Sequence, residues 1–275
     1  MKTVRRLAAL GLAVAVYAYG SAAIAAPAGD LALIAAAIRS GRLIQAELML
    51  ARSVPSPDMS EVELDVLRAQ LALAQGRDAD ALRGFTAIAA TLPEDCRVLA
   101  GGGIAEANLG NADSAIGHLE RAVQRCDPTW RTWSALGTAY DAKQRWADSG
   151  KAYAKALEIG GRRPDLLNDA ATSFIKQRRF DEAEILLREA NALTPRDERI
   201  ANNLDIAAGS LGRMPVRATS DGSSRWAERL NNAGYAAMLA GRTDDARRWL
   251  TQAIVADPVF QSVAAANLAK LDRPK

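Results

Sequence analysis

The side chains that most often carry out catalysis are scarce in this sequence of 275 residues. It contains one histidine, His118, and two cysteines, Cys96 and Cys126. Catalysis requires reactive groups that converge on one site, and a single histidine excludes a two-histidine metal motif. Neither a Gly-x-Ser-x-Gly nucleophile elbow nor a phosphate-binding P-loop motif is present. We therefore predict a protein that is not an enzyme and that uses no cofactor, metal or small-molecule substrate.

The helices that would position such side chains can be located from one small residue, which we call the marker. It recurs along the chain with nearly constant spacing. From Ala46 the marker recurs at Ala81, Ala115, Ser149 and Ala183, in steps of 35, 34, 34 and 34 residues. A further copy stands at Ala246. Each marker follows a short turn that usually contains glycine. A second alanine comes seven residues after four of the markers, at Ala122, Ala156, Ala190 and Ala253. Self-similarity at a fixed period indicates a repeat protein.

The 34-residue period resembles that of the tetratricopeptide-repeat (TPR) family. Residues 130–140 also carry the first-helix signature of that family, Trp133-x2-Leu136-Gly137-x2-Tyr140. The resemblance implies an all-α, right-handed solenoid of helix-turn-helix repeats, in which small residues let the two helices of a repeat approach closely. The sequence departs from the pattern where Ser149 replaces alanine. It also places Gly101-Gly102-Gly103 inside a first helix, which we expect to be the weakest helix because interior glycine is unfavourable.

The repeat register divides the chain into three parts after an N-terminal signal. Residues 26–213 contain five repeats and a half repeat, and residues 214–224 are expected to form a polar loop that contains Gly and Ser. Residues 225–275 contain a final repeat and a capping helix.

Residues 1–25 have the pattern of a secretory signal peptide. Lys2, Arg5 and Arg6 precede the apolar residues 7–16, and an Ala-x-Ala cleavage pattern ends at Ala25. We expect cleavage after Ala25 and a periplasmic protein, and the alternative is an uncleaved membrane anchor. The whole chain has 35 basic and 32 acidic residues, and the signal contains three of the basic ones. The remaining chain is therefore neutral, which argues against nucleic acid as a partner.

The two cysteines flank the repeat that contains the three glycines. Antiparallel helices return the chain to its starting edge, so Cys96 and Cys126 should lie near each other. A disulfide is therefore possible in an oxidising compartment, and two separate thiols are the alternative. His118 falls on the outer face of a second helix, where we expect it to be solvated.

In the TPR family, partner segments usually bind the concave face that first helices line. The register places three polar pairs there, Asn168-Asp169, Asn202-Asn203 and Asn231-Asn232. A carboxamide both donates and accepts hydrogen bonds, so a ladder of asparagines could hold the backbone of an extended partner. Alternatively, asparagine is simply common at this position. The residues predicted to form or border this groove are Arg131, Thr138, Asp141, Asn168, Thr172, Lys176, Arg199, Asn202, Asn231 and Tyr235.

Residues 166–206 and 230–258 are similar to the TPR component of the tight-adherence (Flp) pilus assembly system. The similarity rests on residues 166–169, 181–190 and 230–235. It implies a periplasmic scaffold whose partners are proteins of an envelope assembly or secretion machine. The alternative is a periplasmic chaperone or adaptor for envelope or exopolysaccharide biogenesis. The membrane would be a partner only if the signal is not cleaved.

Overall fold

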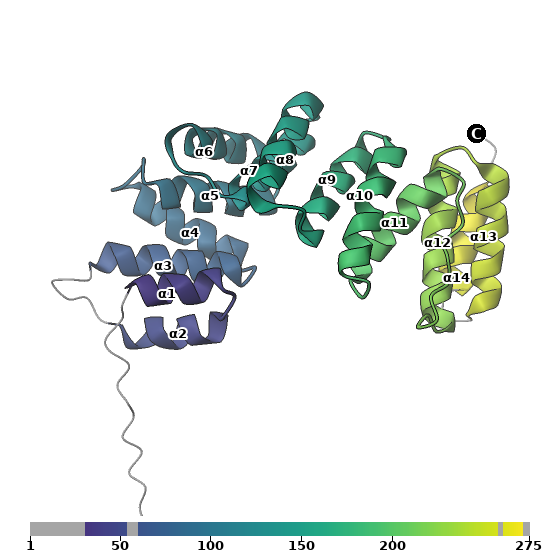
Figure 1. Ribbon diagram of the computed structural model, residues 1–275, viewed down its shortest axis with the longest axis horizontal. Helices are drawn as coiled ribbons and strands as arrows, with labels where there is room; N and C mark the ends of the chain where they lie inside the picture. The colour runs from purple at the N-terminus through teal and green to yellow at the C-terminus, as the bar shows by residue number, and fades with distance from the viewer. Residues whose placement is uncertain (1–30, 54–59, 258–260, 272–275) are drawn as a thin grey trace, which may run out of the picture.

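In the computed structural model, residues 31–53, 60–257 and 261–271 are described, and they form fourteen α-helices and no strand. The predicted signal peptide, residues 1–25, lies outside these ranges. The helices follow one another from α1 at one end of an elongated molecule to α14 at the other (Figure 1). The first helices of the repeats are α1 (Leu31–Arg39), α3 (Glu61–Ala74), α5 (Cys96–Asn108), α7 (Trp130–Ala142), α9 (Pro164–Lys176), α11 (Glu198–Ser210), α12 (Ser223–Leu239) and α14 (Gln261–Leu271). The second helices are α2 (Leu43–Arg52), α4 (Asp78–Ala89), α6 (Ala112–Arg125), α8 (Trp146–Gly160), α10 (Phe180–Leu193) and α13 (Thr243–Ala256). The prediction of an all-α repeat fold is confirmed.

The marker residues of the repeat lie where paired helices cross. Ala46, Ala81, Ala115, Ser149, Ala183 and Ala246 all have an exposed fraction of 0%. A crossing of two helix backbones leaves no room for a long side chain, which explains the small residues at this position. Gly137, on the first helix of its repeat, is also at a position with no room for a larger side chain, since a Cβ there would lie 2.9 Å from the Tyr153 ring.

The turn between the helices of a repeat contains one residue in the left-handed conformation, as many helix C-termini do. Glycine occupies it in most turns, but Gln144 and Arg178 adopt it with φ of 56° and 60°. Gly212 adopts it after α11 with φ of 79°, in the same 34-residue register. The half repeat therefore ends its helix as a complete repeat does, and the chain departs from the pattern only beyond residue 212.

No second helix follows α11, and α12 packs directly against it. The two backbones approach so closely that a Cβ on Gly209 would lie 2.5 Å from the Ala233 carbonyl oxygen. Residues 211–222 form the irregular connection. The predicted loop, 214–224, ends two residues too late, because Ser223 and Ser224 belong to α12. Both hydroxyls donate hydrogen bonds to Asp257 after α13, a long-range contact that local composition does not reveal.

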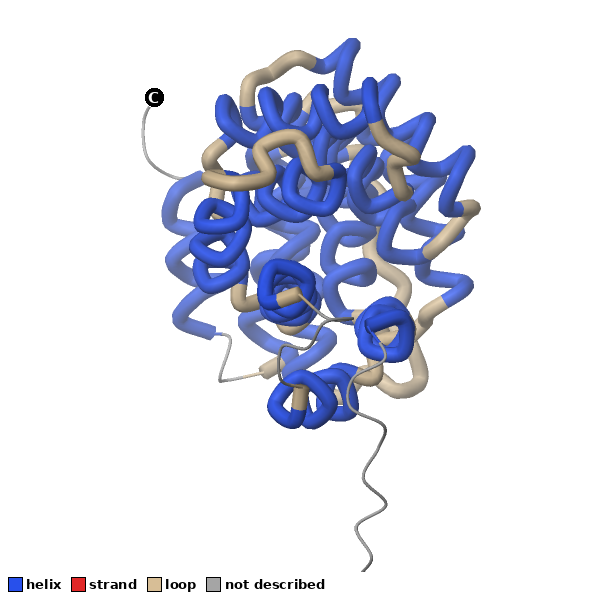
Figure 2. The backbone as a smooth tube through the Cα atoms, turned by 90° about the vertical axis from the view of Figure 1, so that its left-hand side faces the viewer, coloured by secondary structure: helices blue, strands red, loops and turns tan. Residues whose placement is uncertain are grey.

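Seen from the α1 end, the helices are spread around the long axis rather than aligned in one flat row (Figure 2). Successive repeats are therefore rotated relative to each other, as in other solenoids. This rotation gives the row of first helices a concave face on which side chains far apart in the sequence become neighbours.

Candidate protein-interaction surfaces

Asparagines of the predicted ladder form hydrogen bonds with amides of neighbouring first helices. Asn203 Nδ2 donates to Asn168 Oδ1 at 2.8 Å, and Asn267 Nδ2 donates to Asn231 Oδ1 at 2.9 Å. Asn168 and Asn231 have exposed fractions of only 9% and 8%. Two of the predicted asparagines, Asn168 and Asn203, thus bond to each other, whereas Asn231 bonds to Asn267 of α14, which the prediction did not include. These amide pairs hold α9 to α11 and α12 to α14 before any partner binds.

Asn202 differs from the other members of the ladder. Its Nδ2 donates to Glu228 Oε1 at 3.4 Å. Its Oδ1 is buried and has no hydrogen-bond partner within the described part of the chain. Asn202 therefore keeps an acceptor that its surroundings do not satisfy.

Two predicted groove residues use their hydroxyl groups within the solenoid. Thr172 Oγ1 donates to the Asn168 carbonyl oxygen at 2.8 Å, one turn earlier in α9. Thr138 Oγ1 lies 3.0 Å from the Tyr153 hydroxyl. Both side chains are half-buried, so they present little polar surface to a partner.

Asp141 does not border an open groove, contrary to the prediction. Its side chain is 3% exposed, and its carboxylate accepts hydrogen bonds from the hydroxyls of Ser149 and Ser173. The Tyr153 hydroxyl also donates to it, at 3.4 Å. A buried carboxylate needs such donors because desolvation strongly disfavours an unsatisfied charge. The network also explains why serine replaces the family's alanine at position 149.

Four predicted groove residues do reach solvent, namely Arg131, Lys176, Arg199 and Tyr235. The Arg131 guanidinium stacks over the Trp130 ring at 4.3 Å. Arg199 forms an ion pair with Asp197 at 2.9 Å. The ring of Tyr235 packs against the Lys270 ammonium, 5.1 Å from the ring centroid.

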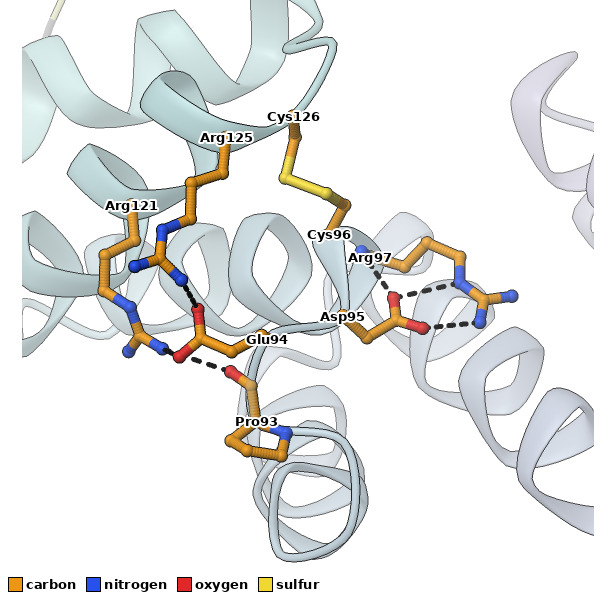
Figure 3. The surroundings of a disulfide bond; sticks show 8 residues. All are labelled: Pro93, Glu94, Asp95, Cys96, Arg97, Arg121, Arg125 and Cys126. Carbon is orange, nitrogen blue, oxygen red and sulfur yellow. Dashed lines mark hydrogen bonds and ion pairs between the residues drawn. A yellow bond between two sulfur atoms is a disulfide. The ribbon is translucent and has the colours of Figure 1, made fainter.

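The structure joins Cys96 and Cys126 in a disulfide, with the two Cα atoms 5.7 Å apart (Figure 3). Cys96 is the first residue of α5 and Cys126 directly follows α6. The bond therefore closes the open end of one helical hairpin. Glu94, beside it, forms ion pairs with both arginines of the last turns of α6, Arg121 and Arg125.

The glycines of α5 allow close packing against two second helices. A Cβ on Gly101 would lie 2.2 Å from the Phe85 ring, and one on Gly103 would lie 2.7 Å from Leu119. Gly102 differs, because its Cβ would meet Phe85 at an ordinary 3.5 Å. At two of the three positions, the intrinsic cost of glycine in a helix is therefore linked to a tertiary contact.

A groove of about 790 Å³ opens on the first helices of the N-terminal half. Its walls come mainly from α1, α3, α5 and the first turn of α7, together with the disulfide and residues 127–129, and Leu43 of α2 and Ala122 of α6 also line it. Of the residues predicted to contact a partner, only Arg131 lines it. The prediction missed this groove because the asparagine pattern draws attention to the C-terminal half, whereas the groove is lined by a mixture of aliphatic and polar side chains that shows no repeated pattern.

The junction between α11 and α12 is held by a buried ion-pair network. Arg229 of α12 forms two hydrogen bonds with the Asp205 carboxylate of α11, at 2.7 and 2.8 Å. It also contacts Asp221 at 2.9 Å and the Val216 carbonyl oxygen at 2.8 Å. The side chains of Asp205 and Arg229 are only 2% and 12% exposed. Burial raises the pKa of Asp205, and the Arg229 guanidinium opposes that shift.

His118 is not simply a solvated surface residue, as the sequence suggested. Its ring is 40% exposed, but Nδ1 lies 2.8 Å from Oε2 of Glu106, a glutamate buried in α5. Within residues 31–53, 60–257 and 261–271, no group of three or more His, Cys, Asp or Glu side chains could hold a metal ion. In the same ranges, no helix combines the length and apolar character needed to cross a bilayer.

The 34-residue register, the paired helices and the concave row of first helices define the fold as a TPR solenoid. Solved structures support this class. The TPR protein TTC0263 of Thermus thermophilus has a TM-score of 0.51 at 18% identity, covering 64% of this chain and 96% of its own. A TPR protein of Parabacteroides merdae has a TM-score of 0.50 at 14% identity, covering 88% and 97%. The Cut9–Hcn1 hetero-tetramer of the APC/C reaches 0.58 at 16% identity, covering 87% and 48%.

A characterised protein is similar to this chain in part of its sequence. Cytochrome c-type biogenesis protein CycH of Pseudomonas aeruginosa is 28% identical over 158 residues, which cover 54% of this chain. The match spans 37% of the length of CycH. No protein-family profile matches the chain.

Proposed function

We propose that this protein is an exported TPR scaffold that binds segments of other proteins during the assembly of cell-envelope components, and that it has no enzymatic activity. The observation that carries the proposal is the concave face itself: consecutive first helices form a continuous surface with an open groove of about 790 Å³. The signal-peptide pattern of residues 1–25 and the Cys96–Cys126 disulfide both fit an oxidising compartment.

The assembly pathway is proposed from sequence similarity. The match to CycH, a cytochrome c-type biogenesis protein, favours maturation of c-type cytochromes. The second candidate is tight-adherence pilus assembly, favoured by the similarity of residues 166–206 and 230–258 to its TPR component. Deleting the gene in its source organism separates the two. Loss of haem-staining c-type cytochromes supports the first, and loss of surface pili with normal cytochromes supports the second.

Site-specific photo-crosslinking tests whether the concave face binds proteins. Benzoylphenylalanine would replace Leu73 in the groove or Thr172 on the C-terminal concave face. The control position is Ile185 on the second helix α10, a side chain that is 65% exposed. The full chain, expressed with its own N-terminus, should fractionate with the periplasm. Crosslinks to envelope proteins are expected from Leu73 or Thr172 and not from Ile185. A cytoplasmic protein, or crosslinks only from Ile185, would count against the proposal.

A further inference from the structure

The two halves of the concave face differ in how far their polar groups are already satisfied. In the C-terminal half, Asn203 bonds to Asn168 and Asn267 bonds to Asn231. In the N-terminal half, α1, α3, α5 and α7 also contact one another, and the Arg97–Glu63 ion pair joins α5 to α3, but among the described residues no pair of asparagines links these helices. A partner that docks there displaces few internal hydrogen bonds, which lowers the cost of binding.

The floor of the groove is aliphatic. Ile38 of α1, Leu43 of α2, Leu73 of α3 and Ile104 of α5 all line it, and all four are half-buried. Small residues between them, Ala74, Ala100 and Gly101, contribute little bulk and keep the groove open. Such a surface gains free energy when apolar side chains cover it.

The rim of the groove carries arginines of two kinds. Arg97 is neutralised, because it forms ion pairs with Glu63 and with Asp95. Arg39, in the last turn of α1, and Arg131, in the first turn of α7, have no carboxylate partner within the described part of the chain.

One acidic residue, Asp127, also lines the rim, close to Arg131 in sequence and likewise without an ion-pair partner among the described residues. The unpaired charges that face the groove are thus two guanidinium groups and one carboxylate.

We propose that the groove formed by α1, α3, α5 and α7 binds an apolar protein segment that carries carboxylate side chains, with Arg39 and Arg131 pairing with those carboxylates. This inference rests on the proposed scaffold function and specifies the chemistry of the partner. The aliphatic floor takes the apolar side chains, and the two arginines select against basic segments through charge repulsion.

Three synthetic peptides test the selection directly. All three would share one pattern of Leu and Ile residues and differ only in having Glu, Gln or Lys at the flanking polar positions. Fluorescence anisotropy with the full-length protein at low salt should show the Glu peptide binding about tenfold more tightly than the Gln peptide. The Lys peptide should bind most weakly. Equal affinities for the Glu and Lys peptides would overturn the inference.

Charge reversal and groove filling locate the binding site. Arg39→Glu with Arg131→Glu should reverse the order of the three peptides. The matched control, Arg52→Glu with Lys151→Glu, changes the net charge equally outside the groove and should leave the order unchanged. Ala74→Phe, at an exposed groove position, should weaken binding of all three peptides at least tenfold. Circular dichroism would verify that each variant folds.

Three results would contradict the inference. In the first, the order of peptide affinities is unchanged by the charge reversal of Arg39 and Arg131. In the second, the control variant changes that order as much as the groove variant does. In the third, the protein self-associates and the double reversal abolishes the self-association. The last would show that a second copy of the chain occupies the groove. If peptides bind elsewhere, this inference fails while the scaffold proposal stands. If no concave position crosslinks to an envelope protein, the scaffold proposal fails whatever the peptides show.

Discussion

The α5–α6 hairpin and the α11–α12 junction both depend on a glycine inside a first helix, but they are held together in different ways. In the hairpin, Gly103 of α5 makes room for the Leu119 side chain of α6, and a disulfide closes the open end of the helix pair. At the junction, Gly209 makes room for the backbone of Ala233, and Arg229 pairs with the buried Asp205. The hairpin follows the repeat pattern, and a covalent bond joins its two ends. The junction lacks a second helix, and direct packing of α12 on α11 together with a buried ion pair takes its place.

The difference shows how a solenoid tolerates an irregular repeat. Each repeat of a solenoid contacts only its neighbours, so a lost helix has to be compensated locally. At the junction, α12 packs directly on α11 in place of the missing second helix. Arg229 of α12 also holds the connection of residues 211–222 through Asp221 and the Val216 carbonyl oxygen. The hairpin needs no such rearrangement, because its two helices are both present.

The largest expected effect is on the junction. Arg229→Met leaves the buried Asp205 carboxylate without a counter-charge and should lower the free energy of unfolding of the α11–α14 region by about 4 kcal/mol. Hydrogen exchange of the amides of α11 and α12 would measure this locally. The double variant Asp205→Leu/Arg229→Met should recover part of the loss, since the Asp205 carboxylate is then removed and only the Asp221 carboxylate, 9% exposed, lacks its guanidinium partner. A loss below about 1 kcal/mol for Arg229→Met would contradict the role given to this pair.

The disulfide should contribute somewhat less to the other region. Its sulfurs join residues 30 apart in sequence, and reduction should lower the stability of the α5–α6 region by roughly 3–4 kcal/mol in the chain-entropy model. Urea unfolding with and without a phosphine reductant would measure the change. The variant Cys96→Ser/Cys126→Ser serves as the control, because the reductant should not affect it. Intact mass without reductant that shows two free thiols would rule out the bond.

The glycines of α5 provide a matched pair with opposite expected signs. Gly101→Ala forces a methyl group into the Phe85 ring and should cost about 2 kcal/mol. Gly102→Ala meets only ordinary contacts and should stabilise the protein by roughly 0.5–1 kcal/mol, because alanine favours the helix. Thermal unfolding of both variants would test this. Two changes of the same sign and size would show that the helix does not pack as described.

The smallest expected effect is a pH dependence at the groove wall. Hydrogen bonds from Arg97 lower the pKa of Glu63 and of Asp95 below their ordinary values of 4.5 and 3.8. Stability from these pairs is present above those values and is lost as the pH falls through the lowered pKa values. Arg97→Gln should therefore destabilise the protein at pH 7 and have less effect at pH 3. Urea unfolding at both pH values would check this, and a difference that grows on acidification would contradict the sign.

The sequence predicted the repeat because its signal is local and periodic. The spacing of Ala46, Ala81 and Ala115 follows from the helix crossings that each repeat contains, and all three are fully buried. The half repeat was predicted in the same way, from the absence of a second marker after α11. The end of the loop was misplaced because serine is typical of loops, whereas Ser223 and Ser224 begin α12 and bond to Asp257.

The candidate site was harder to predict than the fold. Asparagine spacing indicated which side chains face the next repeat, but spacing does not reveal whether an amide faces a partner or a neighbouring amide. Asp141 is the clearest case, since its register suggested a groove border and three hydroxyl groups around it define a buried network. No sequence motif marks the groove at α1, α3, α5 and α7, because the groove forms where small residues leave space between larger side chains.

By itself, the sequence determined the helical class, the 34-residue register and the position of the break near residue 213. Each of these depends on contacts within a repeat or between adjacent repeats, so it recurs along the chain. Only the tertiary structure decided that α12 packs on α11, that Cys96 meets Cys126 and that the open groove lies in the N-terminal half. Those features depend on how successive repeats are rotated and how closely particular backbones approach, and no single segment encodes either one.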